Sequence, residues 1–203
     1  MIKKSITFFL FILCFFTIDA QSTPQQILNK AISSIVSAKG VEAKFTIYNS
    51  GYSGTGEIKS LGKKFHVILP DVEVWYNGKD LYTYNKRISE TTVVTPTPEE
   101  LSESNPLAYV SGASDNYNVA FSTVKKAGSE VLELTPKKRS EIKRITLTLK
   151  KTDSAPEKIV VEPKNGNPIR ADIGSFKTGM NFSESEFNYP ESKYPKVEIV
   201  DLR

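Results

Sequence analysis

The sequence has a single cysteine, Cys14, and a single histidine, His66, among its 203 residues. One cysteine cannot form a disulfide within the chain, and one histidine without a second histidine or cysteine offers no familiar metal site or nucleophile-base pair. A strong charge of one sign is also missing, because the formal net charge is +4 and the lysines are spread along the chain. Nucleic-acid recognition would need a concentrated basic patch with interleaved aromatic residues. We therefore expect a protein that is not an enzyme, needs no metal or cofactor and binds no nucleic acid.

Long apolar runs are absent apart from one at the N-terminus. Two lysines precede an apolar segment over residues 6–18, and Ala20 supplies a small residue for cleavage. This arrangement is typical of a secretory signal peptide. A membrane anchor is the alternative, but the run is shorter than the ~20 residues that span a bilayer. We expect residues 1–20 to be removed during export, Cys14 with them, and residues 21–203 to form one domain.

The mature chain begins with the pattern of an amphipathic helix. Thr23 can cap this helix, Pro24 suits its first position, and apolar residues recur at helical spacing up to Val36. Lys39-Gly40 provides its end.

From Val41 onward apolar residues alternate with polar ones, which is the period of half-buried strands. Asn77-Gly78 predicts a type I′ turn between two aromatic strands, and the glycine-rich stretch 51–56 predicts another turn. About ten short strands joined by tight turns favour a curved antiparallel sheet over βαβ units. The expected strands cover residues 41–48, 57–59, 64–69, 72–76, 80–84, 91–95, 117–124, 130–135, 142–150, 157–162, 168–176 and 180–187, with 196–200 as a further candidate.

Two short apolar helical turns interrupt the series of strands. A capping box at Thr97–Glu100, with a proline at the first position, starts the first turn. The second follows Asn105-Pro106, places Leu107 and Val110 on one side and ends at Gly112. A sheet with a small apolar lid forms a container, so the pattern predicts a carrier of an apolar ligand.

The order of these features resembles the outer-membrane lipoprotein carrier (LolA) family over essentially the whole mature chain. The hairpin Asn77–Tyr84 and the segment Val131–Leu149, which contains the run Leu-Thr-Pro-Lys, are the most specific pieces. Gly56-Glu57-Ile58 and the closing Phe187-Asn188-Tyr189-Pro190 occur in the family's order. The resemblance implies a mainly β, α+β fold: one curved antiparallel sheet forming an unclosed barrel of about eleven strands, capped by an N-terminal helix and a short helical lid.

The resemblance also implies a function. It indicates a monomeric carrier in the periplasm of a Gram-negative bacterium, which encloses the acyl chains of lipoproteins and shuttles them from the inner to the outer membrane. Its partners would be acylated lipoproteins, an inner-membrane lipoprotein-releasing ABC transporter and an outer-membrane acceptor. The expected wall of the hydrophobic cavity consists of Ile35, Phe45, Ile47, Phe65, Val67, Trp75, Leu101, Leu107, Val110 and Leu147.

One region departs from the family pattern. Family members carry an arginine between a Gly-Asp/Glu-Leu/Ile strand and a Phe-x-Trp strand, where it holds the lid closed. This chain reads Ser60-Leu61-Gly62-Lys63-Lys64-Phe65 at that place, with no arginine, and Val67 stands where the tryptophan would be. Lys63 and Lys64 are latch candidates, although lysine lacks the rigid donor fork of arginine. The alternative, which the sequence supports equally, is that Lys63 and Lys64 only solvate the start of a strand.

Three other functions remain open from the sequence. A lipid- or lipoprotein-sensing module on the same fold would usually carry a further C-terminal domain, which favours the carrier. A periplasmic hydrolase would need more than His66 and a pair of carboxylates, Glu184 and Glu186, on one expected strand face. A carrier for another acylated product also fits, because the departures from the family pattern lie at the cavity and the latch.

Overall fold

The computed structural model describes residues 22–36 and 39–203, so the predicted signal peptide and its cleavage site lie outside the described residues. Helix α1 (Pro24–Val36) forms where the sequence predicts it. Thr23 and Gln26 exchange the hydrogen bonds of a capping box: Gln26 Oε1 accepts from the Thr23 N–H at 2.8 Å, and Thr23 Oγ1 accepts from the Gln26 N–H at 3.3 Å. The helix buries one apolar stripe, formed by Leu28, Ala31 and Ile35.

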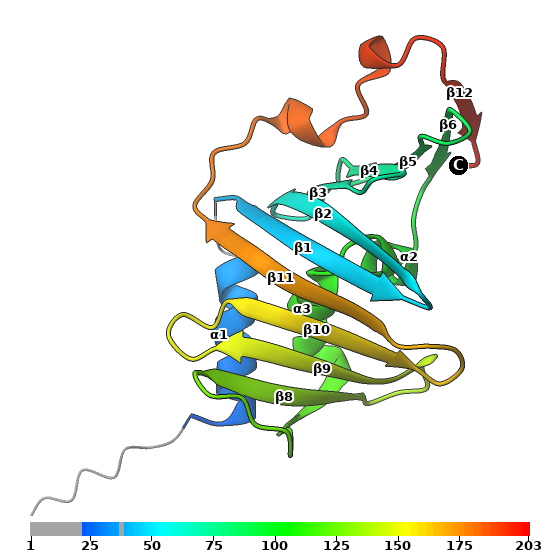
Figure 1. The fold of residues 1–203 in the computed structure, drawn as a ribbon. Coiled ribbons are helices and arrows are strands. Elements are labelled where there is room, and N and C mark those ends of the chain that lie inside the picture. Colours follow the sequence, from blue (N-terminus) through cyan, green and yellow to red (C-terminus); the bar gives the residue numbers. More distant parts are fainter. Residues whose placement is uncertain (1–21, 37–38) are drawn as a thin grey trace, which may run out of the picture.

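The twelve strands that the structure describes belong to one curved sheet, in the order β12-β6-β5-β4-β3-β2-β1-β11-β10-β9-β8-β7 (Figure 1). The two end strands, β12 and β7, are not paired with each other, so the sheet is an unclosed barrel. The strands are β1 (Val41–Asn49), β2 (Tyr52–Leu61), β3 (Lys64–Ile68), β4 (Val72–Tyr76), β5 (Leu81–Asn85), β6 (Glu90–Val94), β7 (Tyr117–Phe121), β8 (Ser129–Pro136), β9 (Ile142–Lys150), β10 (Pro156–Pro163), β11 (Ile169–Thr178) and β12 (Glu198–Asp201).

This architecture confirms the expected fold class. Neighbouring strands are antiparallel along the sheet, except that β12 pairs with β6 in parallel. The sheet has twelve strands where the resemblance implies about eleven, and the candidate at residues 196–200 joins it as β12.

Three short helices connect β6 to β7: α2 (Pro98–Ser104), α3 (Ala108–Ser111) and α4 (Ala113–Asn116). They lie on the same side of the sheet as α1, which we call the inner face (Figure 1). We call residues 97–112 the lid. Its expected start is confirmed, since Thr97 and Glu100 form a complete capping box with a proline in the first turn. Its second turn begins where Asn105 Oδ1 accepts from the Leu107 N–H at 2.8 Å.

Two turn predictions are wrong in position. The type I′ geometry occurs at Ser50-Gly51, where both residues have positive φ, so β2 starts at Tyr52 and replaces the expected turn over 51–56. At Asn77-Gly78 only the glycine has positive φ. The Asn77 side chain accepts from the backbone N–H groups of Lys79 and Asp80, and this favours a four-residue loop instead.

The expected strand over residues 180–187 is also wrong. A third capping box, between Ser183 and Glu186, starts a 3₁₀ turn at Glu184–Phe187, and a further 3₁₀ turn follows at Glu191–Lys193. This segment leaves the end of β11 and crosses to the far end of the sheet, where β12 pairs with β6 (Figure 1). We call residues 180–197 the strap, and the face of the sheet that it covers the outer face.

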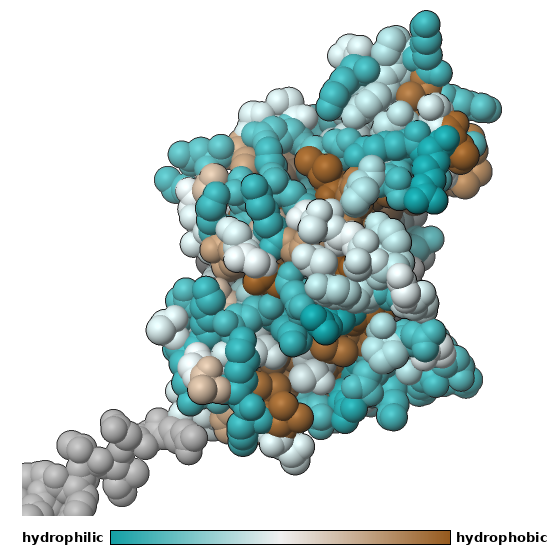
Figure 2. All heavy atoms as spheres, in the orientation of Figure 1, coloured by the Kyte–Doolittle hydropathy of each residue, from teal (hydrophilic) through white to brown (hydrophobic). Residues whose placement is uncertain are grey.

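The outer face is turned toward the viewer in Figure 2, because α1 and α3 lie behind the strands in the same orientation. Hydrophilic side chains predominate on it, and hydrophobic ones gather only in small, separate patches (Figure 2). The apolar side of the sheet is therefore the inner one, under the helices.

Candidate functional site

The inner face carries two clusters of buried apolar side chains. The helix-covered cluster lies on β8–β11 and packs against α1, α3 and α4. The lid-covered cluster lies on β1–β5 and, among the described residues, has Leu107 of the lid as its only buried member from outside the sheet. Its buried members are Val41, Ala43, Phe45, Ile58, Phe65, Val67, Val74, Tyr76, Leu81 and Leu107.

The two clusters differ in what covers them. The buried stripe of α1 and Val110 and Ala113 of α3 and α4 seal the helix-covered cluster. The lid-covered cluster is covered by Leu107, which is 1% exposed, and by the half-buried Leu101. Leu107 and Val110 are three residues apart but belong to different clusters, so the lid bridges both. The lid-covered cluster is therefore the part of the core that a local movement can open.

The structure brings most of the expected cavity residues to this region. Phe45, Phe65, Val67 and Leu107 lie in the lid-covered cluster, and Ile47 and Leu101 pack against it. Ile35, Val110 and Leu147 belong to the helix-covered cluster instead. The last three residues form ordinary core, sealed by the N-terminal helix.

Trp75 does not belong to the inner face, which corrects its place in the expected cavity wall. In the register of β3 and β4, Phe65 pairs with Tyr76 and His66 pairs with Trp75. Side chains of adjacent strand residues point to opposite faces, so Tyr76 joins the lid-covered cluster and Trp75 faces outward. Tyr76 was missed because β4 is buried on both faces and carries an aromatic residue on each, so the aromatic character alone does not show which residue lies inside.

The latch prediction also needs a correction. Lys64 shares the outer face with His66, and its Nζ pairs with Glu184 of the strap. Its ammonium group is therefore on the opposite side of the sheet from the lid. Lys63 is exposed in the turn between β2 and β3. Glu184 and Glu186 lie in a 3₁₀ turn and not on a strand face, and each of them binds a lysine from the sheet: Lys64 and, at 3.1 Å, Lys59.

The outer face of the hairpin β4–β5 is an aromatic contact surface for the strap. Trp75 contacts Tyr189 edge-on with ring centroids 5.3 Å apart, and Tyr82 stacks on Tyr189 at 5.4 Å. The Thr91 hydroxyl donates to the Tyr189 hydroxyl at 3.0 Å. The outward-facing aromatic residues Trp75 and Tyr82 thus anchor the C-terminal segment and do not line the candidate cavity, in contrast to Tyr76.

His66 takes part in a polar cluster below the strap. Its Nε2 lies 2.8 Å from Oε1 of Glu73, and its ring stacks on Trp75 at 4.9 Å. The Tyr194 hydroxyl donates to Glu73 Oε2 at 3.2 Å, and Lys86 Nζ lies 3.9 Å from the same oxygen. Burial opposes ionisation of Glu73, but the hydrogen bond from His66 and the surrounding positive charge lower the pKa of its carboxyl below the ordinary value. Among the described residues, no group of three or more histidine, cysteine or acidic side chains is placed to hold a metal ion.

This polar cluster predicts a pH-dependent contribution to stability. Glu73→Gln should lower the free energy of unfolding by about 1–3 kcal/mol at neutral pH, because the side chain is buried and its hydrogen bond is charge-assisted. A carboxyl with a lowered folded-state pKa stabilises above its unfolded value, 4.5, and loses this contribution as the pH falls through the folded-state pKa. Urea unfolding of both proteins over a pH series measures the difference. A difference that stays constant into strong acid would contradict this role.

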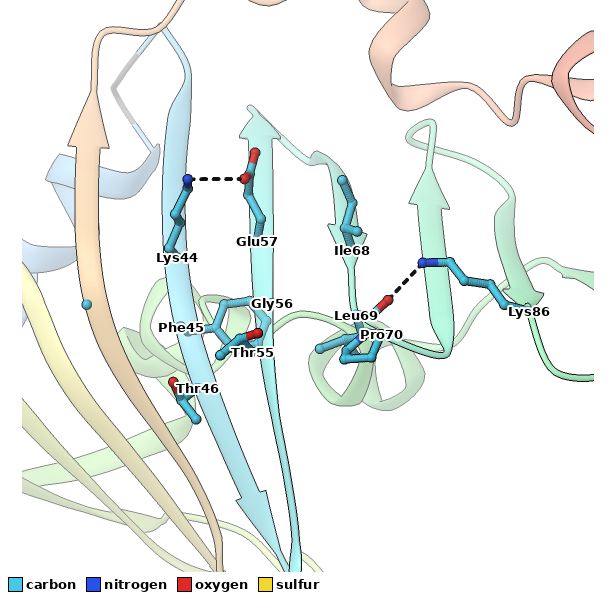
Figure 3. A pocket seen from close by; sticks show the side chains of 11 residues that line it. Lys44, Phe45, Thr46, Thr55, Gly56, Glu57, Ile68, Leu69, Pro70 and Lys86 are labelled. Carbon is cyan, nitrogen blue, oxygen red and sulfur yellow. Dashed lines mark hydrogen bonds and ion pairs between the residues drawn. The ribbon is translucent and has the colours of Figure 1, made fainter.

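A groove that the sequence analysis did not anticipate opens on the outer face beside β2 (Figure 3). Its volume is about 590 Å³. Phe45 and Leu69, whose side chains also pack in or against the lid-covered cluster, form part of its lining. The groove is therefore contiguous with the candidate cavity region.

A curved, unclosed sheet with an apolar inner face and a bridging helical lid defines this chain as a lidded half-barrel. The family model of the outer membrane lipoprotein carrier protein LolA matches residues 13–164, and the chain belongs to this family. No curated protein sequence matches the chain.

Solved structures show the same architecture at low sequence identity. A conserved protein of Thermus thermophilus is 12% identical, with a TM-score of 0.60, over 87% of this chain and 98% of that one. A lipoprotein-sorting protein domain from Vibrio parahaemolyticus is 13% identical, with a TM-score of 0.49, over 81% and 96% of the two chains. MucB in its complex with MucA from Pseudomonas aeruginosa is 14% identical, with a TM-score of 0.46, and the match covers 82% of this chain but only 60% of that one. The first of these supports the fold.

None of the helices in the described part of the chain is long and apolar enough to cross a membrane.

Proposed function

We propose that this protein is a periplasmic carrier that encloses the acyl chains of lipoproteins against the lid-covered cluster and moves them from the inner to the outer membrane. Family membership supports this proposal. The main observation behind the proposal is the way in which that cluster is covered. A large apolar face on five strands is closed by the short lid, and the lid inserts the fully buried Leu107 side chain into this face.

The energies favour opening of the lid by a ligand. Exposing the lid side chains Leu101, Leu107 and Val110 costs roughly 1.5–3 kcal/mol for each. Each buried methylene contributes ~0.8 kcal/mol, so a sixteen-carbon acyl chain represents about 12 kcal/mol of exposure to water. Burial of one acyl chain can therefore offset the cost of displacing the lid. The free energy that remains must not be captured in full as binding affinity, because the cargo would then not be released. A loosely enclosing cavity meets that condition.

The cargo pathway is part of the proposal. Loading would come from an inner-membrane lipoprotein-releasing ABC transporter, and release would occur to an outer-membrane acceptor. The acyl chains would enter by outward displacement of the lid, because Leu107 and Val110 fill the inner face when the lid is closed.

Amide hydrogen exchange tests the lid directly. Residues 97–112 should exchange quickly in the empty protein and slow down when an acylated lipoprotein is bound, because the ligand would hold the lid in one position. Strands β8–β10 provide the internal reference, since the helix-covered cluster should respond little. Strong protection of the lid in the empty protein, or no change on binding, would contradict the carrier function. Mass spectrometry of the molecules that co-purify with the native protein would identify the cargo, including any other acylated product.

A further inference from the structure

Strand β2 extends beyond its neighbour β3. It pairs with β1 from Tyr52 to Ser60, but with β3 only from Glu57 to Leu61. Among the strands that the structure describes, none pairs with the first half of β2 on the β3 side. This half is therefore a free strand edge inside an otherwise continuous sheet, at the groove shown in Figure 3.

The turn geometry shows which backbone groups point into the groove. In a hairpin closed by a two-residue type I′ turn, the residues next to the turn bond to each other, and every second residue after them does the same. Tyr52, Gly54 and Gly56 thus direct their N–H and C=O groups to β1. Ser53 and Thr55 direct theirs away from β1: Thr55 lines the groove, Ser53 continues the free edge beyond it, and both residues are exposed.

The floor of the groove is apolar. At Gly56, a position of β2 that faces the inner side, the absence of a side chain leaves room for two apolar neighbours. A Cβ at Gly56 would lie 2.7 Å from Phe45 Cζ and 2.8 Å from Leu69 Cδ2, so these two side chains occupy the space that a larger residue would need. Phe45 is part of the lid-covered cluster, and Leu69 packs against it. A ligand in the groove would therefore contact the same apolar side chains as an acyl chain on the inner face.

The rim of the groove carries positive charge. Lys44 on β1 and Lys86 after β5 lie on opposite sides, with their ammonium groups directed inward (Figure 3). Lys44 is 3.9 Å from Glu57, and Lys86 donates to the Leu69 carbonyl oxygen at 2.9 Å. Lys86 Nζ also lies 3.9 Å from Glu73 Oε2, so each lysine of the rim already has a carboxylate partner, and the rim makes no demand on the charge of an occupant.

We propose that an extended peptide segment of the cargo, directly after its acylated N-terminus, binds here as an added β-strand on the Ser53–Gly56 edge of β2. This inference rests on the proposed carrier function. Main-chain hydrogen bonds to Ser53 and Thr55 would bind the peptide irrespective of most of its sequence, as in other cases of strand addition. A carrier of many different lipoproteins needs recognition of this kind, since the acyl chains and the backbone are what its cargoes share.

Four probes test the proposal: palmitate, an N-palmitoylated hexapeptide, the same acylated peptide with N-methylated amides at the residues facing β2, and the hexapeptide without its acyl group. The acylated peptide should bind about tenfold more tightly than palmitate, the gain expected from one or two net hydrogen bonds. N-methylation should remove this gain. Titration followed by the amide signals of Ser53 and Thr55 locates the contact.

A pair of variants at one position provides the matched control. Thr55→Pro removes the outward N–H, which a free strand edge tolerates, whereas Thr55→Val keeps it. The proline variant should lose the tenfold gain and bind palmitate as the wild type does, and the valine variant should keep both. If the proline variant does not fold, the N-methylated peptide tests the same bonds in the wild-type protein.

The outcomes separate the two proposals. Binding of palmitate together with equal affinity for the methylated and unmethylated peptides would overturn strand addition and leave the carrier function intact. A response of Ser53 and Thr55 to the unacylated peptide, without palmitate binding, would support the edge site and overturn the carrier function. Absence of binding by all four probes would overturn both.

Discussion

Leu107→Glu should reduce the affinity for an acylated lipoprotein or a fluorescent fatty acid at least tenfold while the protein remains folded. Leu107 is the lid side chain that is fully buried in the lid-covered cluster. In the loaded protein the lid would pack over the acyl chains, and a carboxylate that faces hydrocarbon there loses its hydration without gaining a partner. The helix-covered cluster does not include this residue, and circular dichroism should therefore show the wild-type fold.

The control for this variant is a charge at an exposed position just before the lid, Thr95→Glu. This variant should bind as the wild type does, because its carboxylate stays in water. His66→Ala is a second control, since its side chain lies on the outer face under the strap. If Leu107→Glu left binding unchanged while His66→Ala abolished the activity, the acyl chains would not lie under the lid and a different function would have to replace the carrier.

Phe187→Ala should produce the largest loss of stability. The Phe187 side chain is completely buried in the strap although it belongs to neither inner cluster, and its ring contacts Phe182 edge-on at 6.1 Å. Truncation of a buried phenylalanine costs about 3–5 kcal/mol, a large part of the roughly 5–15 kcal/mol that stabilises a typical domain. Urea unfolding monitored by the fluorescence of Trp75, the only tryptophan of the chain, measures this loss and reports directly from the surface under the strap.

Ile88→Ala is the matched control, because Ile88 is 63% exposed and its truncation should change the free energy of unfolding by less than about 0.5 kcal/mol. At temperatures where Phe187→Ala is still folded, it should bind acyl chains normally, since the lid is on the other face of the sheet. A loss of stability no larger than that of the control would mean that the strap does not contribute to the core. A loss of acyl binding in the folded variant would mean that the two faces are coupled.

The sequence by itself determined the elements that depend on interactions between residues close together in the chain. The capping boxes at Thr23 and Thr97 placed the starts of α1 and of the lid, because a side chain three residues away satisfies the same backbone groups in any surroundings. Alternation on β1 and β3 placed Phe45, Phe65 and Val67 on one face, and the structure groups these three in one cluster. The order of these elements was also sufficient to indicate the family that the comparison shows.

Only the tertiary structure decided the features that depend on distant partners. Strand β4 is buried on both faces, and the outward position of Trp75 is covered by the strap, whose Tyr189 contacts Trp75 from more than a hundred residues away. Lys64 binds Glu184 for the same reason, and Glu186 binds Lys59, so the path of this segment over the outer face depends on lysines that are remote in the sequence. The free edge of β2 arises from a difference in the lengths of two neighbouring strands. Such contacts bring together residues that are remote in the sequence, whereas caps and periodicity act over a few residues, and this difference in range explains what the sequence alone did not determine.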